Sequence, residues 1–163
     1  MLGGVVVSPG ASFLLGYAGG PATGTINGGI AAIGAAQVAV HNALIRGAVL
    51  VRGGAGPVVP VPTCWPPSFL SPWCWYFSDF EGSTIDGAVT INGYDGIWLG
   101  FIRNHVNGTV MLTNNRQTYD ETDVGANVVH GNLLCSGNVP LENTGGSPSS
   151  PSQVTGHDAC NGT

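Results

Sequence analysis

The side chains that could carry out chemistry in this chain are few: nine carboxylates, four histidines and four arginines among 163 residues. The carboxylates that stand closest together are Asp79 with Glu81, and Asp120 and Glu121 with Asp123 in an expected turn. Clustered carboxylates can bind Ca²⁺, and a pair of them can divide the acid and base roles of glycosidic cleavage. Solvated carboxylates are the simpler interpretation, and we predict no catalytic residue. A polysaccharide-active enzyme that uses the acidic turn is the less favoured alternative.

The four histidines occupy different positions in the sequence repeat described below. His105 precedes the first apolar residue of its repeat, His130 follows it, His157 follows the repeat glycine, and His41 lies four residues before Ile45. A metal site needs side chains that converge, whereas these should point in different directions. We therefore expect surface or turn histidines, with no metal ion and no cofactor.

A Pro- and aromatic-rich segment, residues 57–82, interrupts the repeat and holds a large share of the thirteen aromatic residues. Exposed Trp and Tyr rings favour binding surfaces, and they offer flat faces on which a sugar could stack. The favoured alternative is that these rings cover an open flank of the fold. The candidate glycan-binding residues are Trp65, Trp73, Trp75 and Tyr76.

A five-residue pattern, apolar-x-Gly-x-apolar, recurs along the chain and indicates its architecture. The copies begin at Leu2, Ile26, Ile45, Ile85, Val106, Val129 and, in degenerate form, Val154. Their spacings of 24, 19, 40, 21, 23 and 25 residues are typical of a solenoid with one coil per repeat, and the interval of 40 suggests two coils with extra chain. We predict an all-β, right-handed parallel β-helix of about 21–25 residues per coil, forming a single domain over residues 1–163.

Each coil should contain two strands and two turns. Ile85, Val89 and Ile91 alternate with other residues as in a strand with one buried face. A turn at Asn92-Gly93 and a second strand over residues 97–102 would complete the coil. The repeat glycine fits a place where a Cβ atom would collide with the adjoining coil, so the polar residue before it should face solvent. Residues 140–153 are expected to form a loop before the last coil.

Stacking in register predicts two buried columns of apolar side chains. The first column comprises Ile26, Ile45, Ile85, Val106 and Val129. The second comprises Ile30, Val49, Val89, Val110 and Leu133.

Four cysteines permit three disulfide pairings. Cys135 and Cys160 each lie four residues after a repeat glycine, so they occupy equivalent positions in neighbouring coils. Stacked strands lie ~4.8 Å apart, within the Cα separation that a disulfide tolerates. We predict the pairs Cys135–Cys160 and Cys64–Cys74, with free thiols or a metal site as alternatives. Disulfides would place the protein in an oxidising compartment.

The composition excludes several classes of protein. Charged residues make up 8% of the chain, lysine is absent, and the formal net charge is −5; a nucleic-acid-binding protein needs a basic surface. A hydrophobic content of 43% argues against disorder. No apolar run is long enough to span a membrane. The apolar residues 1–7 lack the basic region of a signal peptide and are expected to form a strand.

The C-terminal half resembles a known group of proteins. The run Gly131-Asn132-Leu133-Leu134-Cys135-Ser136-Gly137-Asn138-Val139-Pro140, a Gly/Ser/Pro-rich loop, and Val154-Thr155-Gly156 with Cys160 are similar to the end of certain secreted actinobacterial β-solenoid proteins. The resemblance covers about residues 84–160. It implies a right-handed parallel β-helix and export from the cell, and it carries no catalytic residues.

These features together favour an extracellular structural or surface protein that acts through self-assembly or adhesion. Its expected partner is itself, as a homo-oligomer or a filament, because both ends of the solenoid carry few charges or prolines that would block strand pairing. A glycan-binding module is the alternative, and glycan is then the expected partner. We expect neither nucleic acid nor a transmembrane segment.

Overall fold

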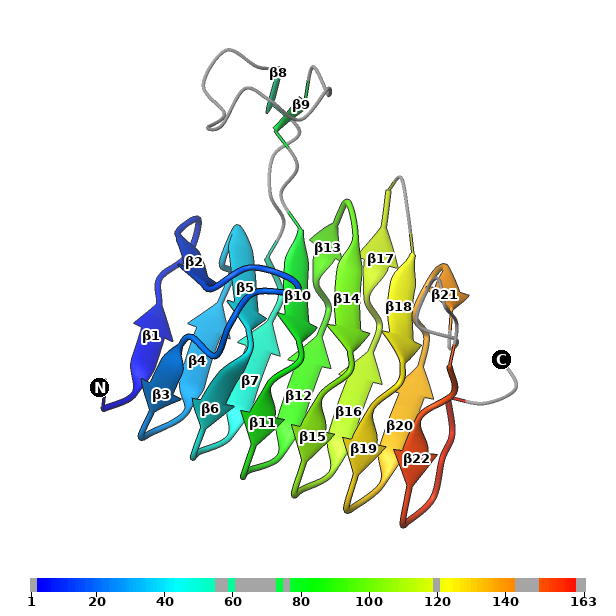
Figure 1. Cartoon of the computed structure of the whole chain (residues 1–163). Helices are drawn as coiled ribbons and strands as arrows, with labels where there is room; N and C mark the ends of the chain where they lie inside the picture. The colour runs from blue at the N-terminus through cyan, green and yellow to red at the C-terminus, as the bar shows by residue number, and fades with distance from the viewer. Residues whose placement is uncertain are drawn as a thin grey trace.

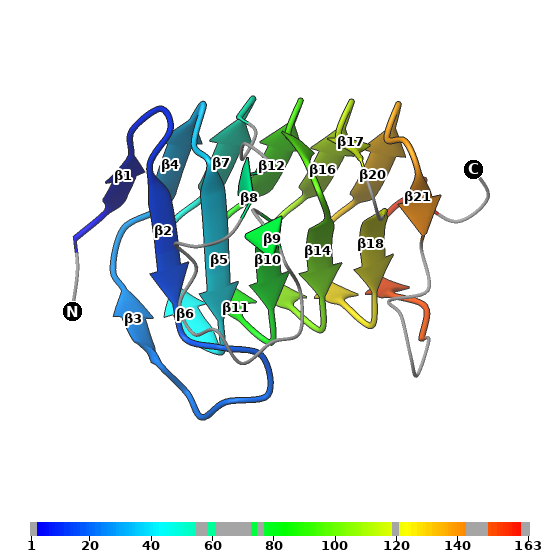
Figure 2. The ribbon, with the colours of Figure 1, turned by 90° about the horizontal axis from the view of Figure 1, so that it is seen from above.

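The computed structural model describes residues 3–54, 59–60, 73–74, 77–118, 121–142 and 150–160; for residues 59–60, 73–74 and 142 it describes the backbone alone. These residues form strands, turns and bends, without a helix. Three six-stranded parallel sheets run along the molecule and together form a β-solenoid (Figures 1 and 2). The predicted fold class is thereby confirmed.

Each sheet takes one strand from every coil, in chain order. The first sheet comprises β1 (Val5–Val7), β4 (Ile30–Ile33), β7 (Val49–Arg52), β12 (Val89–Asn92), β16 (Val110–Thr113) and β20 (Leu133–Ser136). The second comprises β2 (Ser12–Leu15), β5 (Gln37–His41), β10 (Ser78–Glu81), β14 (Leu99–Ile102), β18 (Thr122–Gly125) and β21 (Leu141–Glu142). The third comprises β3 (Gly24–Ile26), β6 (Ala43–Ile45), β11 (Thr84–Ile85), β15 (His105–Val106), β19 (Val128–Val129) and β22 (Gln153–Val154).

Two short strand pairs stand beside the three sheets. The parallel pair β13 (Asp95–Gly96) and β17 (Arg116–Gln117) lies in the chain between the first and the second sheet. The antiparallel pair β8 (Val59–Pro60) and β9 (Trp73–Cys74) belongs to the Pro- and aromatic-rich segment.

A coil contains three principal strands, so the prediction of two strands per coil is wrong. The stretch from Ile85 to Ile91, predicted as one strand, is divided between β11 and β12 by a bend at Asp86-Gly87. Ile85 and Val89 both point into the core because they approach it from two sides of a corner. The apolar alternation therefore arose from a bend and not from a single pleat.

The repeat glycines lie at this corner, where adjoining coils come closest. A Cβ atom on Gly87 would lie 2.6 Å from the backbone nitrogen of Ala48, which no real side chain tolerates. Gly28, Gly47, Gly108 and Gly131 have equivalent contacts of 2.5–2.9 Å with the preceding coil. The predicted reason for the glycine is confirmed, and the polar residues that precede it are exposed.

The 40-residue interval of the repeat is one coil and not two. Ile45 of β6 pairs directly with Ile85 of β11, and Val49 of β7 with Val89 of β12. The extra length comes from the segment between β7 and β10. Ser78–Glu81 forms β10, which belongs to the stacked second sheet. The C-terminal part of the expected 57–82 insertion thus lies within the coil.

Both predicted columns of apolar side chains are confirmed. The strand registers align every member of each column with its neighbours, and none of these residues is more than 2% exposed. On the opposite side of the core, Phe80 and Phe101 stack with ring centroids 6.4 Å apart. The interior is therefore continuous from coil to coil.

A ladder of polar side chains supports the corner between the second and third sheets. Asn104 and Asn127 each donate a side-chain hydrogen bond to a carbonyl of the preceding coil, that of Phe80 (2.6 Å) and that of Phe101 (2.8 Å) respectively. The backbone nitrogen of Asn104 donates to the side-chain oxygen of Asn127 at 2.9 Å, and that of Ser83 to Asn104 at 3.1 Å. Buried amides that are satisfied in this way fix the corner of successive coils.

The predicted disulfide between Cys135 and Cys160 is present, with the Cα atoms 4.8 Å apart. It joins β20 to the last described coil, where Asp158 forms a bridge with Leu133. Cys64 lies outside the described residues and the side chain of Cys74 is not described, so their pairing stays a prediction.

Candidate functional site

The outer face of the second sheet gathers charged side chains from strands distant in sequence. Glu81 of β10 is in register with His41 of β5, and Asp79 lies two residues earlier on the same face of β10. Asp123 of β18 is in the same row as Asp79, with Gly100 of β14 between them. We call His41, Asp79 and Glu81 the acidic cluster.

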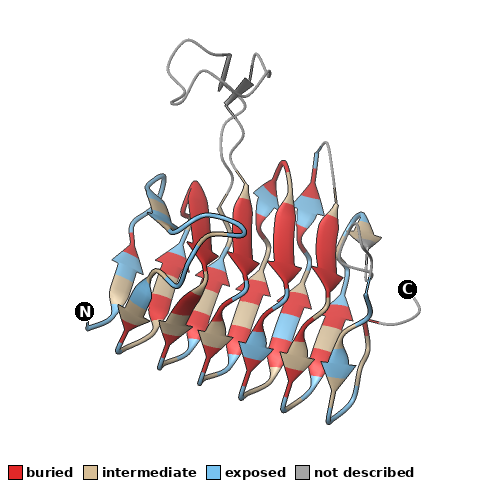
Figure 3. Ribbon diagram, in the orientation of Figure 1, coloured by how far each residue is buried: buried red, intermediate tan, exposed pale blue. Residues whose placement is uncertain are grey.

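The acidic cluster is buried although it lies on an outer face. His41, Asp79 and Glu81 are 5%, 3% and 8% exposed. Figure 3 shows β5, β10, β14 and β18 buried throughout their length. The connection between β2 and β3 crosses this side near His41, because the Thr23 hydroxyl donates to the His41 carbonyl at 2.7 Å. The cluster is therefore shielded from solvent.

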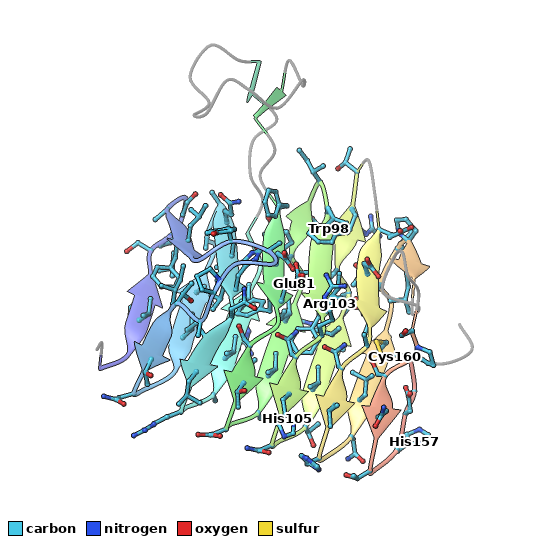
Figure 4. The ribbon with its side chains drawn as sticks, in the orientation of Figure 1. Glu81, Trp98, Arg103, His105, His157 and Cys160 are labelled. Carbon is cyan, nitrogen blue, oxygen red and sulfur yellow. A yellow bond between two sulfur atoms is a disulfide. The ribbon has the colours of Figure 1, made fainter. Side chains whose placement is uncertain are left out.

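Within the acidic cluster, the contacts leave polar atoms unsatisfied. Nε2 of His41 lies 3.3 Å from Oδ2 of Asp79. Nδ1 of His41 and Oδ1 of Asp79 are buried without a hydrogen-bond partner in the described structure. Glu81 differs, because Nε and Nη2 of Arg103 both donate to its Oε1. Figure 4 shows Arg103 beside Glu81, and the Arg103 side chain is half exposed.

Electrostatics favour the neutral form of two of these groups. The pKa of the Asp79 carboxyl is raised to about 8, chiefly by burial and also by the neighbouring Glu81 and Asp123 carboxylates, while Arg103 acts in the opposite direction. Burial also lowers the pKa of His41, against the effect of Glu81. At neutral pH, Asp79 is therefore protonated and His41 uncharged. Glu81, the third group of the cluster, forms an ion pair with Arg103, which lies outside the cluster.

An aromatic pair adjoins the acidic cluster. The rings of Phe77 and Trp98 are 5.9 Å apart. A Cβ atom on Gly100 would collide with the Trp98 ring and lie 2.5 Å from Oδ1 of Asp79. Glycine is therefore required at this position, since only a missing side chain lets the indole ring and the carboxyl share the space above β14. Trp98 is partly exposed.

Several predictions about chemical residues are corrected here. His41 is buried in β5, so it is neither a surface nor a turn histidine, and it converges with two carboxylates. Asp123 lies in β18 and is 5% exposed, so it is not a solvated turn residue. Asp79 and Glu81 are also buried strand residues. His41 and Glu81 each lie four residues before the first apolar residue of a repeat, Ile45 and Ile85, so they share a repeat position that the prediction did not compare.

The other three histidines are exposed, as predicted. The rings of His105 and His130 nevertheless lie 4.9 Å apart, because β15 and β19 are neighbours in the third sheet. Of the candidate glycan-binding residues, Trp65, Trp75 and Tyr76 lie outside the described residues. The side chain of Trp73 is not described either, so these four stay predictions.

The outer face of the first sheet has the opposite character to that of the second. Each strand contributes one outward side chain to a continuous row. No member of the row is charged, and all but one threonine are apolar. Registers place these residues side by side from coil to coil. We call this row the apolar face: Val6, Ala31, Leu50, Thr90, Met111 and Leu134. All six are partly or fully exposed, Val6 to 83%.

An open hollow on the third sheet offers less chemistry. Its lining includes Ala22, Thr25, Leu44 and Thr84, and no lining residue carries a charge. No lining side chain is an acid, a base or a cation, so the hollow offers no group for acid–base catalysis.

Comparison of the chain with models of protein families, with curated proteins and with solved structures finds no match. The described residues contain no helix long and apolar enough to cross a membrane. What the molecule does must therefore be inferred from its own two outer faces.

Proposed function

We propose that the protein is a non-catalytic structural protein that associates with further copies of itself through the apolar face. The observation that carries this proposal is the unbroken, in-register row from Val6 to Leu134. A contiguous exposed apolar strip on a soluble protein commonly marks an interaction surface. We further propose that it acts outside the cytoplasm, since the Cys135–Cys160 disulfide is compatible with an oxidising compartment.

A second copy of the chain is the partner that this surface fits. The outward row beside the apolar face comprises Ile33, Arg52, Asn92, Thr113 and Ser136, which contains a single charge. Two such faces can meet without like-charge repulsion even though the chain carries a net charge of −5. Strands repeat every ~4.8 Å, so the side chains of two facing sheets can interdigitate at any shift by whole coils.

The size of the apolar face sets the strength of this contact. Six strands span roughly 24 Å. A strip of this length that is one side chain wide has an area well below the ~800 Å² that each partner buries in a stable complex. A single contact should therefore be weak and dependent on concentration. Such contacts suit a structural protein that is held at high local density, where many weak interfaces act together.

Sedimentation velocity over a range of concentrations tests the proposal. The wild-type chain should sediment faster as its concentration rises. The double substitution Leu50→Lys with Met111→Lys places two cations on the apolar face and should abolish this dependence. The matched control, Asn107→Lys with Gln153→Lys, adds the same charge at exposed positions elsewhere and should behave as the wild type. A wild-type chain that sediments as a monomer at every concentration would contradict the proposal.

A second candidate function is glycan binding, favoured by the Phe77–Trp98 pair. A partly exposed indole beside buried carboxyl groups offers a stacking surface with polar neighbours. This function would also involve Trp73 and Trp75 of the aromatic segment. Retention on immobilised polysaccharide should then fall when Trp98 is replaced by Ala, and also when Trp73 and Trp75 are both replaced. Unchanged retention of all variants would leave self-association as the function.

A further inference from the structure

The acidic cluster has the donor set of a three-ligand metal site. One imidazole nitrogen of His41 and one carboxylate oxygen from each of Asp79 and Glu81 lie within 4.8 Å of one another. The separation between Nε2 of His41 and Oδ2 of Asp79 is 3.3 Å, longer than the usual N–H···O hydrogen bond. Two ligands of a tetrahedral ion at ~2.0–2.1 Å from the metal lie ~3.3–3.4 Å apart. The measured separation therefore matches the edge of a metal coordination polyhedron.

Two further observations indicate that a ligand completes the cluster. Buried polar atoms in proteins almost always have partners, yet Oδ1 of Asp79 has none in the described structure, although its side chain is only 4% exposed. A carboxylate that binds an ion through both of its oxygens would satisfy this atom. Arg103 contacts Glu81 through one oxygen, Oε1. That contact positions the Glu81 carboxylate while engaging only one of its two oxygens.

We propose that His41, Asp79 and Glu81 bind a single transition-metal dication of the Zn²⁺ class. Imidazole nitrogen favours zinc and related ions, whereas Ca²⁺ prefers oxygen ligands in larger numbers. Three protein ligands leave a fourth position for water, and burial restricts exchange of the ion with solvent. Arg103 acts as a positioning residue, because it holds the Glu81 carboxylate without contacting the ion. The ion would link β5 to β10, which are neighbours in the second sheet but are separated in the chain by β6, β7 and the long segment between β7 and β10.

Titration calorimetry of the full chain, stripped with EDTA, tests this site. Zn²⁺ should bind with a stoichiometry of one, and Ca²⁺ should bind at least ~100-fold more weakly. Asp79→Asn retains the volume of the side chain and replaces one carboxylate oxygen, so it should fold normally while its Zn²⁺ affinity falls at least ~100-fold. His41→Asn should lose binding to the same degree. Co²⁺ added to the wild type should give the visible absorption of a four-coordinate site, and Asp79→Asn should abolish it.

The exposed histidine pair supplies the matched control. His105→Asn with His130→Asn removes two surface imidazoles and should leave Zn²⁺ affinity unchanged. Three results would overturn the site: no Zn²⁺ binding by the wild type, loss of binding in the His105/His130 variant instead, or equal affinity for Ca²⁺ and Zn²⁺ that survives His41→Asn. Folding of each variant is checked by circular dichroism before titration.

Discussion

The outer faces of the first and second sheets are built on the same scaffold and yet carry opposite surfaces. Both are rows of outward side chains on six parallel strands, one from each coil. On the second sheet the row contains Asp79 and Asp123, which are almost fully buried. On the first sheet, Val6 and Met111 are exposed. Both faces depart from the usual arrangement: the second sheet buries acidic side chains, and the first sheet exposes apolar ones.

This difference shows that coil stacking leaves the outer rows free to carry function. The stability of the stack comes from inward columns such as Ile85 and Val106 and from the Asn104–Asn127 ladder. The outer rows contribute little to that interior, so their composition can follow other requirements. Buried charge on one face and exposed apolar surface on another are both costly in isolation. These two costs are the reason why we propose an ion for the former and a second copy of the chain for the latter.

The largest expected effect concerns the two buried columns of apolar side chains, which serve as the reference for substitutions on the outer faces. Val106→Asp buries an unpaired carboxylate between coils at a position with 0% exposure. We expect it to lower the free energy of unfolding by about 4 kcal/mol or to prevent folding. Urea denaturation followed by circular dichroism measures the change. A midpoint equal to that of the wild type would show that the inward columns do not determine stability.

Removal of the disulfide should be the next most damaging change. The bridge between Cys135 and Cys160 closes a loop of ~26 residues, which on the chain-entropy model stabilises the fold by about 3.5 kcal/mol. Replacing both cysteines by serine should lower the free energy of unfolding by about the same amount. The effect should be confined to the C-terminal coils, so hydrogen exchange should rise in β20 and β22 and remain slow in β5 and β10. Uniform acceleration along the chain would contradict this locality.

The pH dependence of stability distinguishes the buried charges from exposed ones. The folded-state pKa of Asp79, about 8, is above its unfolded value. The folded state therefore binds the proton more tightly, and stability decreases as the pH rises towards 8. One proton changes the unfolding free energy by ~1.4 kcal/mol per pH unit, or about 2–3 kcal/mol between pH 5 and pH 7.

Asp79→Asn should remove this loss. With EDTA present, the variant should gain stability relative to the wild type as the pH rises from 5 to 7. The lowered pKa of His41 acts in the opposite direction, stabilising the fold as the pH rises, but it is present in both proteins. Denaturation curves at three pH values measure the difference. Parallel pH profiles for the two proteins would show that Asp79 titrates as an exposed carboxyl.

The sequence predicted the stack well because stacking is a periodic property. The repeat spacing gave both columns, the reason for Gly87 and its equivalents, and the Cys135–Cys160 bridge. Each of these depends on residues at equal positions in successive coils. The number of strands per coil could not be obtained in the same way, because a corner at Asp86-Gly87 and a continuous strand both place Ile85 and Val89 in the core.

The acidic cluster was missed for a related reason. His41 and Glu81 lie side by side on neighbouring strands but are 40 residues apart in the chain. Because the interval of 40 suggests two coils, the prediction does not place the two residues in adjacent coils. Once Ile45 is aligned with Ile85, the same shift of 40 places His41 opposite Glu81. That shift was the signal available in the sequence. The exposure of the apolar face could not be predicted, since an outward Leu50 and an inward Val49 are alike in composition.

The smallest expected effect is the one that separates the two outer faces most directly. Thr90→Asp places a carboxylate in the middle of the apolar face, where the side chain is partly exposed and can remain hydrated. It should change the unfolding free energy by no more than ~0.5–1 kcal/mol, as surface substitutions do.

The matched substitution is Ala39→Asp, which introduces the same group on the outer face of the second sheet. Ala39 is 4% exposed and pairs with Asp79 in the adjacent strand, so the new carboxylate would be both desolvated and beside another acid. Its cost should be several-fold greater and should increase with pH. Equal costs at the two positions would mean that the second sheet is open to solvent in solution, and that its charges lie on an ordinary hydrated surface.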